Sequence, residues 1–533
     1  MSTPSILAVF SEEILELILK ESNTHGPAEY SGLRLVCKAI NDLVEPHVFS
    51  TLIIQFTQGN KDSVGEKLSA LISGSSPYTR WAKTLQFGQL VPLTPHSDYG
   101  FQYDPFQGKE REEVLEKQSR LLVPAIRALA EVEAAIYSCS STRDPINDVL
   151  GALTVLPLLQ ELTLYRIDMD ADLLNKFSKL RSLKIRYPVA ETWQALKSLI
   201  SKSPSLSTLE LLEAYGRGNG GSERESANVD LGSLVKDAME SPTFTPTLSS
   251  LSVSRDAIRL SDSCVPFLRS LAHLRLGEGA IVSPSFWNAL EATGAHLQTL
   301  HVPQLDQHSV KYVLSYSGLK DLKVGWPTKC LGDPAVEDEI THQFFHNVLP
   351  KHCATLRSLS YERGGVGPWC ATDSNMKGIA SCKALQVLDM LYYFPSPNEK
   401  VVMPIIPLGR LLSRFSDSLP SLETVRVTPV RKFQTGFGCG FAWGEYFRAV
   451  HQSFAMSIAR AQVSADQKPR FLLTAVGIEF SPVEGKVDGR YQFKMDECPW
   501  REEGEAGEGE GEEAAVYDPD AWDSEENDIY IGG

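Results

Sequence analysis

The chain has 533 residues, of which 42% are hydrophobic and 22% are charged, and its formal net charge is −16. These values are typical of a soluble globular protein with more than one domain or one long repeat array. No stretch approaches the roughly 18 continuous apolar residues of a membrane span, and no basic segment precedes a cleavable apolar run at the N-terminus. We therefore expect a cytoplasmic and/or nuclear protein without membrane contact.

The nine cysteines are scattered along the chain and include no C-x-x-C pair. Their odd number and irregular spacing argue against a disulfide framework and against a structural zinc site. We interpret them as reduced thiols, most of them buried.

Two short helices are predicted near the N-terminus, in residues 10–20 and 33–44. At 100° per residue, apolar side chains cover an arc of about 200° on each helix, whereas a surface helix needs about half that width to dock on one core. Each helix therefore needs two neighbours. The second neighbour is either the rest of this chain or another protein.

A leucine pattern follows over most of the chain. The sequence L-x-x-L-x-[LIV], or a near variant, occurs ten times. The last two apolar residues of the pattern lie two apart, so on a short strand both point to the same side and can stack on the next strand. The matches begin at Leu159, Leu180, Leu206, Leu248, Leu271, Leu297, Leu319, Leu356, Leu385 and Leu422.

Helix-like segments lie between these strands, so the sequence predicts an α/β array of short parallel strands that alternate with helices. Such a unit buries its apolar face only against the next one in a stack. The array is predicted to span residues 78–482. The helix-like segments are 170–180, 190–203, 283–294 and 306–318.

Further strands and loops complete the predicted array. Degenerate repeat units are expected at 78–90 and 128–138, and a closing strand at 470–480. Four segments are predicted to be loop insertions, where binding residues tend to lie on a rigid scaffold. They are residues 94–109, 213–230, 361–375 and 431–447.

The C-terminal segment 496–533 holds most of the negative charge. Its net charge is −14, which leaves −2 for residues 1–495. Because it combines few apolar residues with high like charge, we expect it to be a disordered solubilising tail. Contact with a basic partner surface is the alternative. No basic stripe accompanies aromatic residues elsewhere, so we expect no nucleic-acid partner.

Several short motifs are candidates for catalytic or metal sites. The glycine-rich segment 216–221 fits G-x-G-x-x-G, but no apolar helix follows it, so we interpret it as part of an insertion. The segment 436–444 is interpreted as a buried turn that packs Phe437, Phe441 and Trp443. The terminal 529–533 resembles a ubiquitin-like tail, but no such fold precedes it.

Two histidine-containing segments are further candidates. His342 and His346 form an H-x-x-x-H pattern that places two imidazoles on one helical face, but no third metal ligand is evident. His352 and Cys353 are sequence neighbours, and neighbours do not face each other on a helix. We therefore expect no metal site, no cofactor and no catalytic dyad.

Residues 6–54 resemble the F-box, the helical module that docks on the adaptor subunit of SCF-type cullin ubiquitin ligases. Glu13, Ile14, Leu15 and Ile18 match the opening of the family motif, and "LVCK" at 35–38 matches its second half. The ending "HVFSTLII" is similar to that of fungal F-box proteins with irregular leucine-rich repeats. Phe10-Ser11 replaces the usual Leu-Pro, with Ser11 as a suitable N-cap.

The resemblance implies a group of adaptor-binding residues and a non-catalytic role. The chain would be the substrate-recognition subunit of the ligase, with the adaptor and a cullin as partners and a protein substrate on the repeats. The alternative is a leucine-rich-repeat interaction scaffold whose N-terminal helices only cap the array. The implied adaptor-binding residues are Phe10, Ile14, Leu15, Ile18, Leu35, Val36, Cys37 and Ile40.

Overall fold

The structure is a computed structural model that divides into two compact units, Met1–Ala295 and His296–Gly533. The structure describes residues 34, 38–56, 61–88, 90, 116, 120–138, 145–165, 170–186, 190–212, 229–241, 244–254, 258–325, 333–361, 368–393, 406–430, 441–461, 463, 469–475, 478–483, 485–486 and 490–495.

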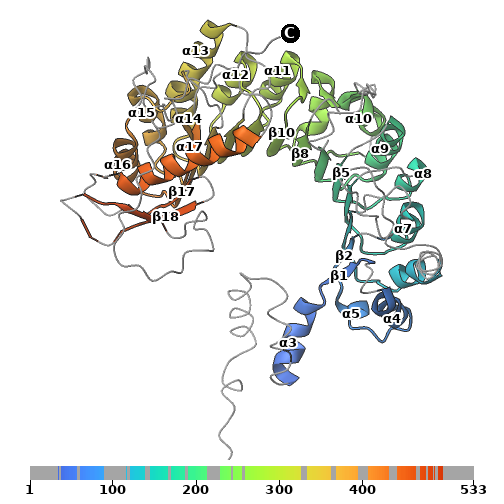
Figure 1. Cartoon of the computed structure of the whole chain (residues 1–533). Coiled ribbons are helices and arrows are strands. Elements are labelled where there is room, and N and C mark those ends of the chain that lie inside the picture. The colour runs from blue at the N-terminus through green and yellow to red at the C-terminus, as the bar shows by residue number, and fades with distance from the viewer. Residues whose placement is uncertain are drawn as a thin grey trace, which may run out of the picture. The chain divides into compact units, whose positions relative to one another are not determined.

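The first unit contains a parallel sheet in which consecutive repeats supply neighbouring strands (Figure 1). The strands lie side by side in chain order, as the predicted stack requires. They are β1 (Thr51–Ile54), β2 (Thr84–Phe87), β3 (Ala134–Tyr137), β4 (Glu161–Tyr165), β5 (Ser182–Arg186), β6 (Thr208–Leu212), β8 (Ser250–Val253) and β10 (His273–Leu276).

A ladder of leucines holds this sheet in register. Leu162, Leu183, Leu209, Leu251 and Leu274 are direct cross-strand partners in β4 to β10, and all are fully buried. The next apolar residue on each strand, two positions later, is buried on the same side. Because side chains alternate across a strand, the residues between them point to the other face.

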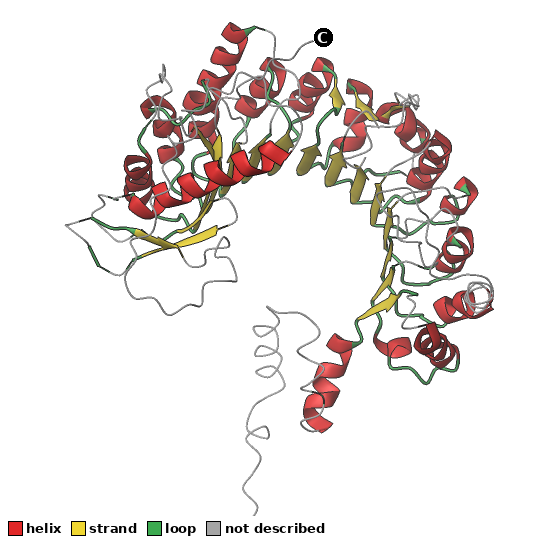
Figure 2. Ribbon diagram, viewed as in Figure 1, coloured by secondary structure: helices red, strands yellow, loops and turns green. Residues whose placement is uncertain are grey.

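Helices cover one face of the first unit's sheet (Figure 2). They supply the apolar side chains that bury the leucine ladder. The helices are α4 (Lys61–Ile72), α5 (Tyr78–Trp81), a helical segment at 120–127, α7 (Ile146–Leu153), α8 (Ala171–Leu174), α9 (Ala190–Lys202), α10 (Leu231–Glu240), the 3-10 helix η2 (Asp262–Leu268) and α11 (Pro284–Thr293). The helix α3 (Lys38–Val48) precedes β1 and has a separate small apolar cluster around Val44.

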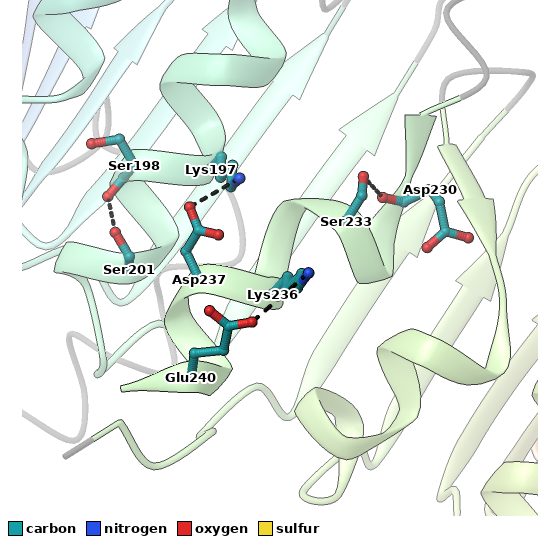
Figure 3. Close-up of polar contacts among 8 residues, drawn as sticks. All are labelled: Lys197, Ser198, Ser201, Asp230, Ser233, Lys236, Asp237 and Glu240. Atoms are coloured by element: carbon teal, nitrogen blue, oxygen red, sulfur yellow. Dashed lines mark hydrogen bonds and ion pairs between the residues drawn. The ribbon is translucent and has the colours of Figure 1, made fainter. Parts of the chain in front are cut away.

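Polar contacts link consecutive helices of this layer, as Figure 3 shows for α9 and α10. Lys197 on α9 pairs with Asp237 on α10 at 2.9 Å, and Lys236 lies 3.9 Å from Glu240 within α10. At the start of α10, Ser233 donates to the carbonyl of Asp230 at 2.7 Å. These contacts are exposed or half-exposed, so they contribute little stability compared with the apolar core.

The first unit also contains a three-stranded parallel sheet, which the repeat pattern does not predict. It consists of β7 (Val229–Asp230), β9 (Ile258–Leu260) and β11 (Ile281–Val282), in the order β11-β9-β7. These strands are two or three residues long and lead into α10, η2 and α11. Strands this short carry too little alternation to be recognised in a sequence.

The second unit is built from the same repeat, with parallel strands whose leucines lie in register. Here the leucine ladder runs through Leu300, Leu322, Leu359 and Leu388, followed by Val425 and Leu473. The parallel strands are β12 (Thr299–Val302), β13 (Asp321–Val324), β14 (Ser358–Tyr361), β15 (Val387–Tyr393), β16 (Thr424–Val430) and β17 (Leu472–Ala475).

The helices of the second unit include one π-helical turn, η3 (Phe344–Val348), which continues α13 (Pro334–Gln343) and precedes α14 (Leu349–His352). Phe344 and Phe345 of this turn are completely buried. The other helices are α12 (Gln307–Ser315), α15 (Asp373–Ser381), α16 (Leu408–Ser418) and α17 (Phe441–Arg460).

The structure confirms the repeat prediction strand by strand. All ten L-x-x-L-x-[LIV] matches are strands, and each strand begins two residues after the first leucine of its match. The segments 78–90 and 128–138 contain β2 and β3. The helices predicted in 190–203, 283–294 and 306–318 are α9, α11 and α12, whereas in 170–180 only α8, a single turn, is helical.

Other expectations need correction. The sheet begins at β1, inside the segment 6–54 that we expected to be a helical module. The closing strand expected at 470–480 is two strands, because β17 is followed by the antiparallel β18 (Ile478–Pro482), which pairs with β19 (Phe493–Met495).

Three of the expected loop insertions are described only in part, and one of them needs correction. The insertion 431–447 is helical from Phe441, the start of α17, so Phe441 and Trp443 do not lie in a turn. The insertion 213–230 ends in β7, and the insertion 361–375 runs from the last residue of β14 to the start of α15.

Candidate interaction surfaces

The N-terminal helical surface is described only in its last part. Of the implied adaptor-binding residues, Ile40 lies on α3, whereas Phe10, Ile14, Leu15, Ile18, Leu35, Val36 and Cys37 lie outside the described residues. Ile40 is half-buried and packs with Leu43 and Val48 against the fully buried Val44. The helix runs through Pro46 to Val48.

The end of α3 is joined firmly to the first repeat. The Phe49 ring meets the Tyr78 ring edge to face at a centroid distance of 4.8 Å, and the Arg34 guanidinium lies 4.5 Å from the Phe49 ring centre. The carbonyl of Ser50 accepts hydrogen bonds from the main-chain N–H groups of Lys83 (2.8 Å) and Thr84 (2.9 Å). Because α3 ends at Val48 and β1 begins at Thr51, only Phe49 and Ser50 separate the helix from the sheet.

The sheet face turned away from the helices forms a second candidate surface in the first unit, which we call the open face. Its side chains on β1 to β3 carry no charge, and Ile53 is 54% exposed. Charge begins at β4. Lys184 pairs with Glu210 at 3.3 Å across β5 and β6, and the Arg186 guanidinium lies 4.3 Å from the centre of the Tyr165 ring.

The corresponding face of the second unit carries cross-strand polar pairs. His301 Nε2 lies 2.9 Å from Asp321 Oδ2, and Arg426 Nη1 lies 3.4 Å from Asp389 Oδ2. Between these pairs, on β14, lies Ser360, which is 8% exposed and whose hydroxyl has no hydrogen-bond partner within the described part of the chain. This surface is thus mixed in charge and internally paired.

The two histidines of the H-x-x-x-H pattern do face each other. The rings of His342 on α13 and His346 on η3 have centroids 4.6 Å apart. Ser374 Oγ lies 3.1 Å from His346 Nε2. The pKa of His346 is lowered by partial burial and also by the nearby side chains of His342 and Lys377. The described residues contain no group of three or more metal-ligating side chains that could hold an ion.

His352 has a structural role. Its Nδ1 accepts the main-chain N–H of Leu319 at 3.2 Å, and its Nε2 lies 3.1 Å from the carbonyl of Val313, to which it donates. This pairing requires the neutral ring, and burial lowers the pKa of His352 accordingly. A ring with both nitrogens engaged by the main chain is not available as a base for the adjacent Cys353.

The described cysteines behave as expected for buried thiols. Cys264, Cys353, Cys370 and Cys382 are not joined in disulfides, and all but Cys353 are buried. Burial raises the pKa of Cys264 to about 12 and that of Cys382 to about 11, so neither is a thiolate at neutral pH. The other five cysteines lie outside the described residues.

Several sequence-based interpretations cannot be placed in the structure. The glycine-rich segment 216–221, the insertion 94–109, the tail 496–533 and Phe437 lie outside the described residues. Within the described ranges, no helix combines the length and the apolar character that a membrane crossing requires.

Comparisons with known proteins give little further guidance. No protein-family model matches the sequence, and no curated protein matches it. Among solved structures, the chain is similar to one in the crystal structure of the Rad7 and Elc1 complex in yeast, with 12% sequence identity and a TM-score of 0.36, over 82% of this chain and 97% of that chain. Similarity at this level carries no argument about function.

Proposed function

We propose that the chain is the substrate-recognition subunit of an SCF-type cullin ubiquitin ligase. It binds the adaptor through the F-box-like residues 6–54, reaches the cullin through the adaptor, and holds a protein substrate on the repeats. The observation that supports this most is the F-box-like sequence ending in α3, two residues ahead of a parallel β/α array.

The proposed role needs no chemistry from this chain. A receptor that holds its substrate in the same assembly as a ubiquitin-charged enzyme raises the effective concentration of substrate lysines. The ubiquitin transfer belongs to other subunits, so the chain requires no cofactor or metal. A cytoplasmic and/or nuclear location follows from this role.

Adaptor binding tests the proposal directly. Purified adaptor is captured by the full chain and by the Ile14→Asp, Val36→Asp double variant, and circular dichroism checks that the variant is folded. Val155→Asp is a matched control, because it makes the same apolar-to-acidic change at an exposed position after α7, outside residues 6–54. We expect the wild type and the control to bind and the double variant not to bind. Absence of adaptor binding by the wild-type chain contradicts the proposal.

The interaction scaffold is the second candidate, and the contacts of Phe49 and Ser50, directly after α3, with α5 and β2 favour it. An array needs its terminal apolar edge covered, and N-terminal helices can do this. Removal of the N-terminal helices tests the scaffold, but the truncated chain must not start as late as residue 60, because it would then also lose β1. A chain starting at Phe49 keeps the sheet complete. Aggregation of this chain supports the cap, whereas a soluble, cooperatively melting chain contradicts it.

A further inference from the structure

The charge on the open face of the first unit changes along the sheet. Its β1–β3 part is uncharged, while β5 and β10 present the basic side chains of Lys184, Arg186 and Arg275. Lys184 is paired with Glu210. Neither Arg186 nor Arg275 forms an ion pair within the described residues, so two positive charges on this face have no acidic partner there.

Arg186 is held in position by an aromatic ring. Tyr165 on β4 and Arg186 on β5 are cross-strand partners, and the guanidinium lies 4.3 Å from the ring centre. Stacking uses the flat side of the guanidinium and leaves the N–H groups at its edge free to bind a carboxylate with two hydrogen bonds. The acidic Glu161 lies on the same strand as Tyr165 but at its opposite end.

Arg275 provides a second positive charge at a fixed distance from Arg186. It is exposed on β10, and its register partners run through Ser252 and Glu210 to Lys184, two residues before Arg186. Three strand spacings and a two-residue offset place the Cα atoms of Arg186 and Arg275 about 16 Å apart. An extended peptide covers that distance with about four or five residues.

We propose that the open face between β4 and β10 binds an extended acidic peptide segment. One carboxylate of the peptide contacts Arg186 on its Tyr165 platform, and a second carboxylate, four or five residues away, contacts Arg275. The inference rests on the proposed function only in taking this segment to be part of the substrate.

Selection from a displayed library of random 12-residue peptides tests the inference on the full chain without adaptor. We expect the selected peptides to be enriched in pairs of Asp or Glu four or five residues apart. Arg186→Gln and Arg275→Gln are each expected to weaken binding of a selected peptide at least tenfold. The matched control is Arg269→Gln, an exposed arginine after η2 in the same unit, which should leave binding unchanged.

Two further variants separate recognition from a general loss of structure. When peptides are selected for binding to the Arg186→Glu variant, Lys or Arg should be enriched at one of the two peptide positions. A misfolded chain would not cause this enrichment. Tyr165 is a positioning residue, so Tyr165→Phe should retain binding because the ring remains, and Tyr165→Ala should weaken it. No selected peptides, no acidic pairs, or affinities independent of Arg186 and Arg275 would each overturn the inference.

The result is independent of the adaptor test. If the adaptor binds but no acidic peptide is selected, only the present inference fails. If an acidic peptide binds through Arg186 and Arg275 but the adaptor does not, the chain recognises a partner without belonging to the ligase.

Discussion

Gly378 on α15 lies directly against the main-chain carbonyl of Phe345 in the π-helical turn η3. A β-carbon at position 378 would overlap with this carbonyl oxygen. The atoms that would have to move belong to helix backbone, not to a flexible side chain. The close approach of α15 and η3 therefore depends on the missing side chain of Gly378.

Gly378→Ala is expected to lower the free energy of unfolding by about 1–3 kcal/mol, because overpacking forces the two helices apart. The matched control is Gly151→Ala in the middle of α7, where an added β-carbon meets nothing within 4 Å. The control should stabilise its helix by about 0.5–1 kcal/mol. Urea denaturation measures both. Equal effects of the two substitutions would show that the contact with Phe345 does not matter.

His352 predicts a specific dependence of stability on pH. Because burial keeps the pKa of His352 in the folded chain below its usual 6.5, the unfolded chain binds a proton at higher pH than the folded chain does. The contribution of His352 to stability is therefore complete above about pH 6.5 and declines as the pH falls below that value.

His352→Gln is the variant that tests this, since the amide does not titrate. At pH 7.5 it should be less stable than the wild type by about 1–3 kcal/mol, because the hydrogen bonds with Leu319 and Val313 are weakened. The difference should shrink towards pH 5.5 in urea denaturation. His346 and His451, whose pKa values are also lowered, are present in both proteins, so their effects cancel. A gap that stays constant with pH argues against the assignment.

The repeating strands were predictable because one short pattern carries their physical requirements. Leu206 closes the turn, and Leu209 and Leu211 point to the core from one side of β6, so the sequence L-x-x-L-x-L contains the turn, the strand and its buried face. The helix α11 was predictable for similar reasons. Ser283 caps its first turn by accepting from the N–H of Phe286, and Gly294 ends it with a left-handed φ of 70°.

The other features depend on contacts between distant segments. The pairing of Arg186 with Tyr165 needs the register of β4 and β5, although the variable positions of the repeat pattern give the signal that could have found it. The helix α17 begins in a segment rich in glycine and aromatic residues, which favours a loop locally. Its burial of Phe454 against Tyr392, at a ring distance of 5.8 Å, shows that tertiary packing supports the helix instead.

The leucine ladder makes a prediction about the two sides of one strand. Leu209→Ala removes a completely buried side chain between Leu183 and Leu251 and should lower the free energy of unfolding by about 3–5 kcal/mol. Leu212→Ala is the same chemical change on the open face of the same strand, where the side chain is half-buried, and should have an effect of about 1 kcal/mol. Urea denaturation distinguishes them. Similar losses at both positions would contradict the assignment of the two faces.

The start of α12 offers a test of local stability. Asp306 Oδ1 accepts the N–H of Ser309 at 2.7 Å, and the Ser309 hydroxyl accepts the N–H of Asp306 at 2.8 Å, so each residue satisfies a main-chain donor of the other. Asp306→Ala should destabilise the chain by about 0.5–2 kcal/mol, whereas Asp306→Asn, which keeps an acceptor oxygen, should be close to the wild type. Thermal melting of the three proteins measures the order. If Asn were as damaging as Ala, the negative charge at the helix N-terminus would be the stabilising element and not the hydrogen bond.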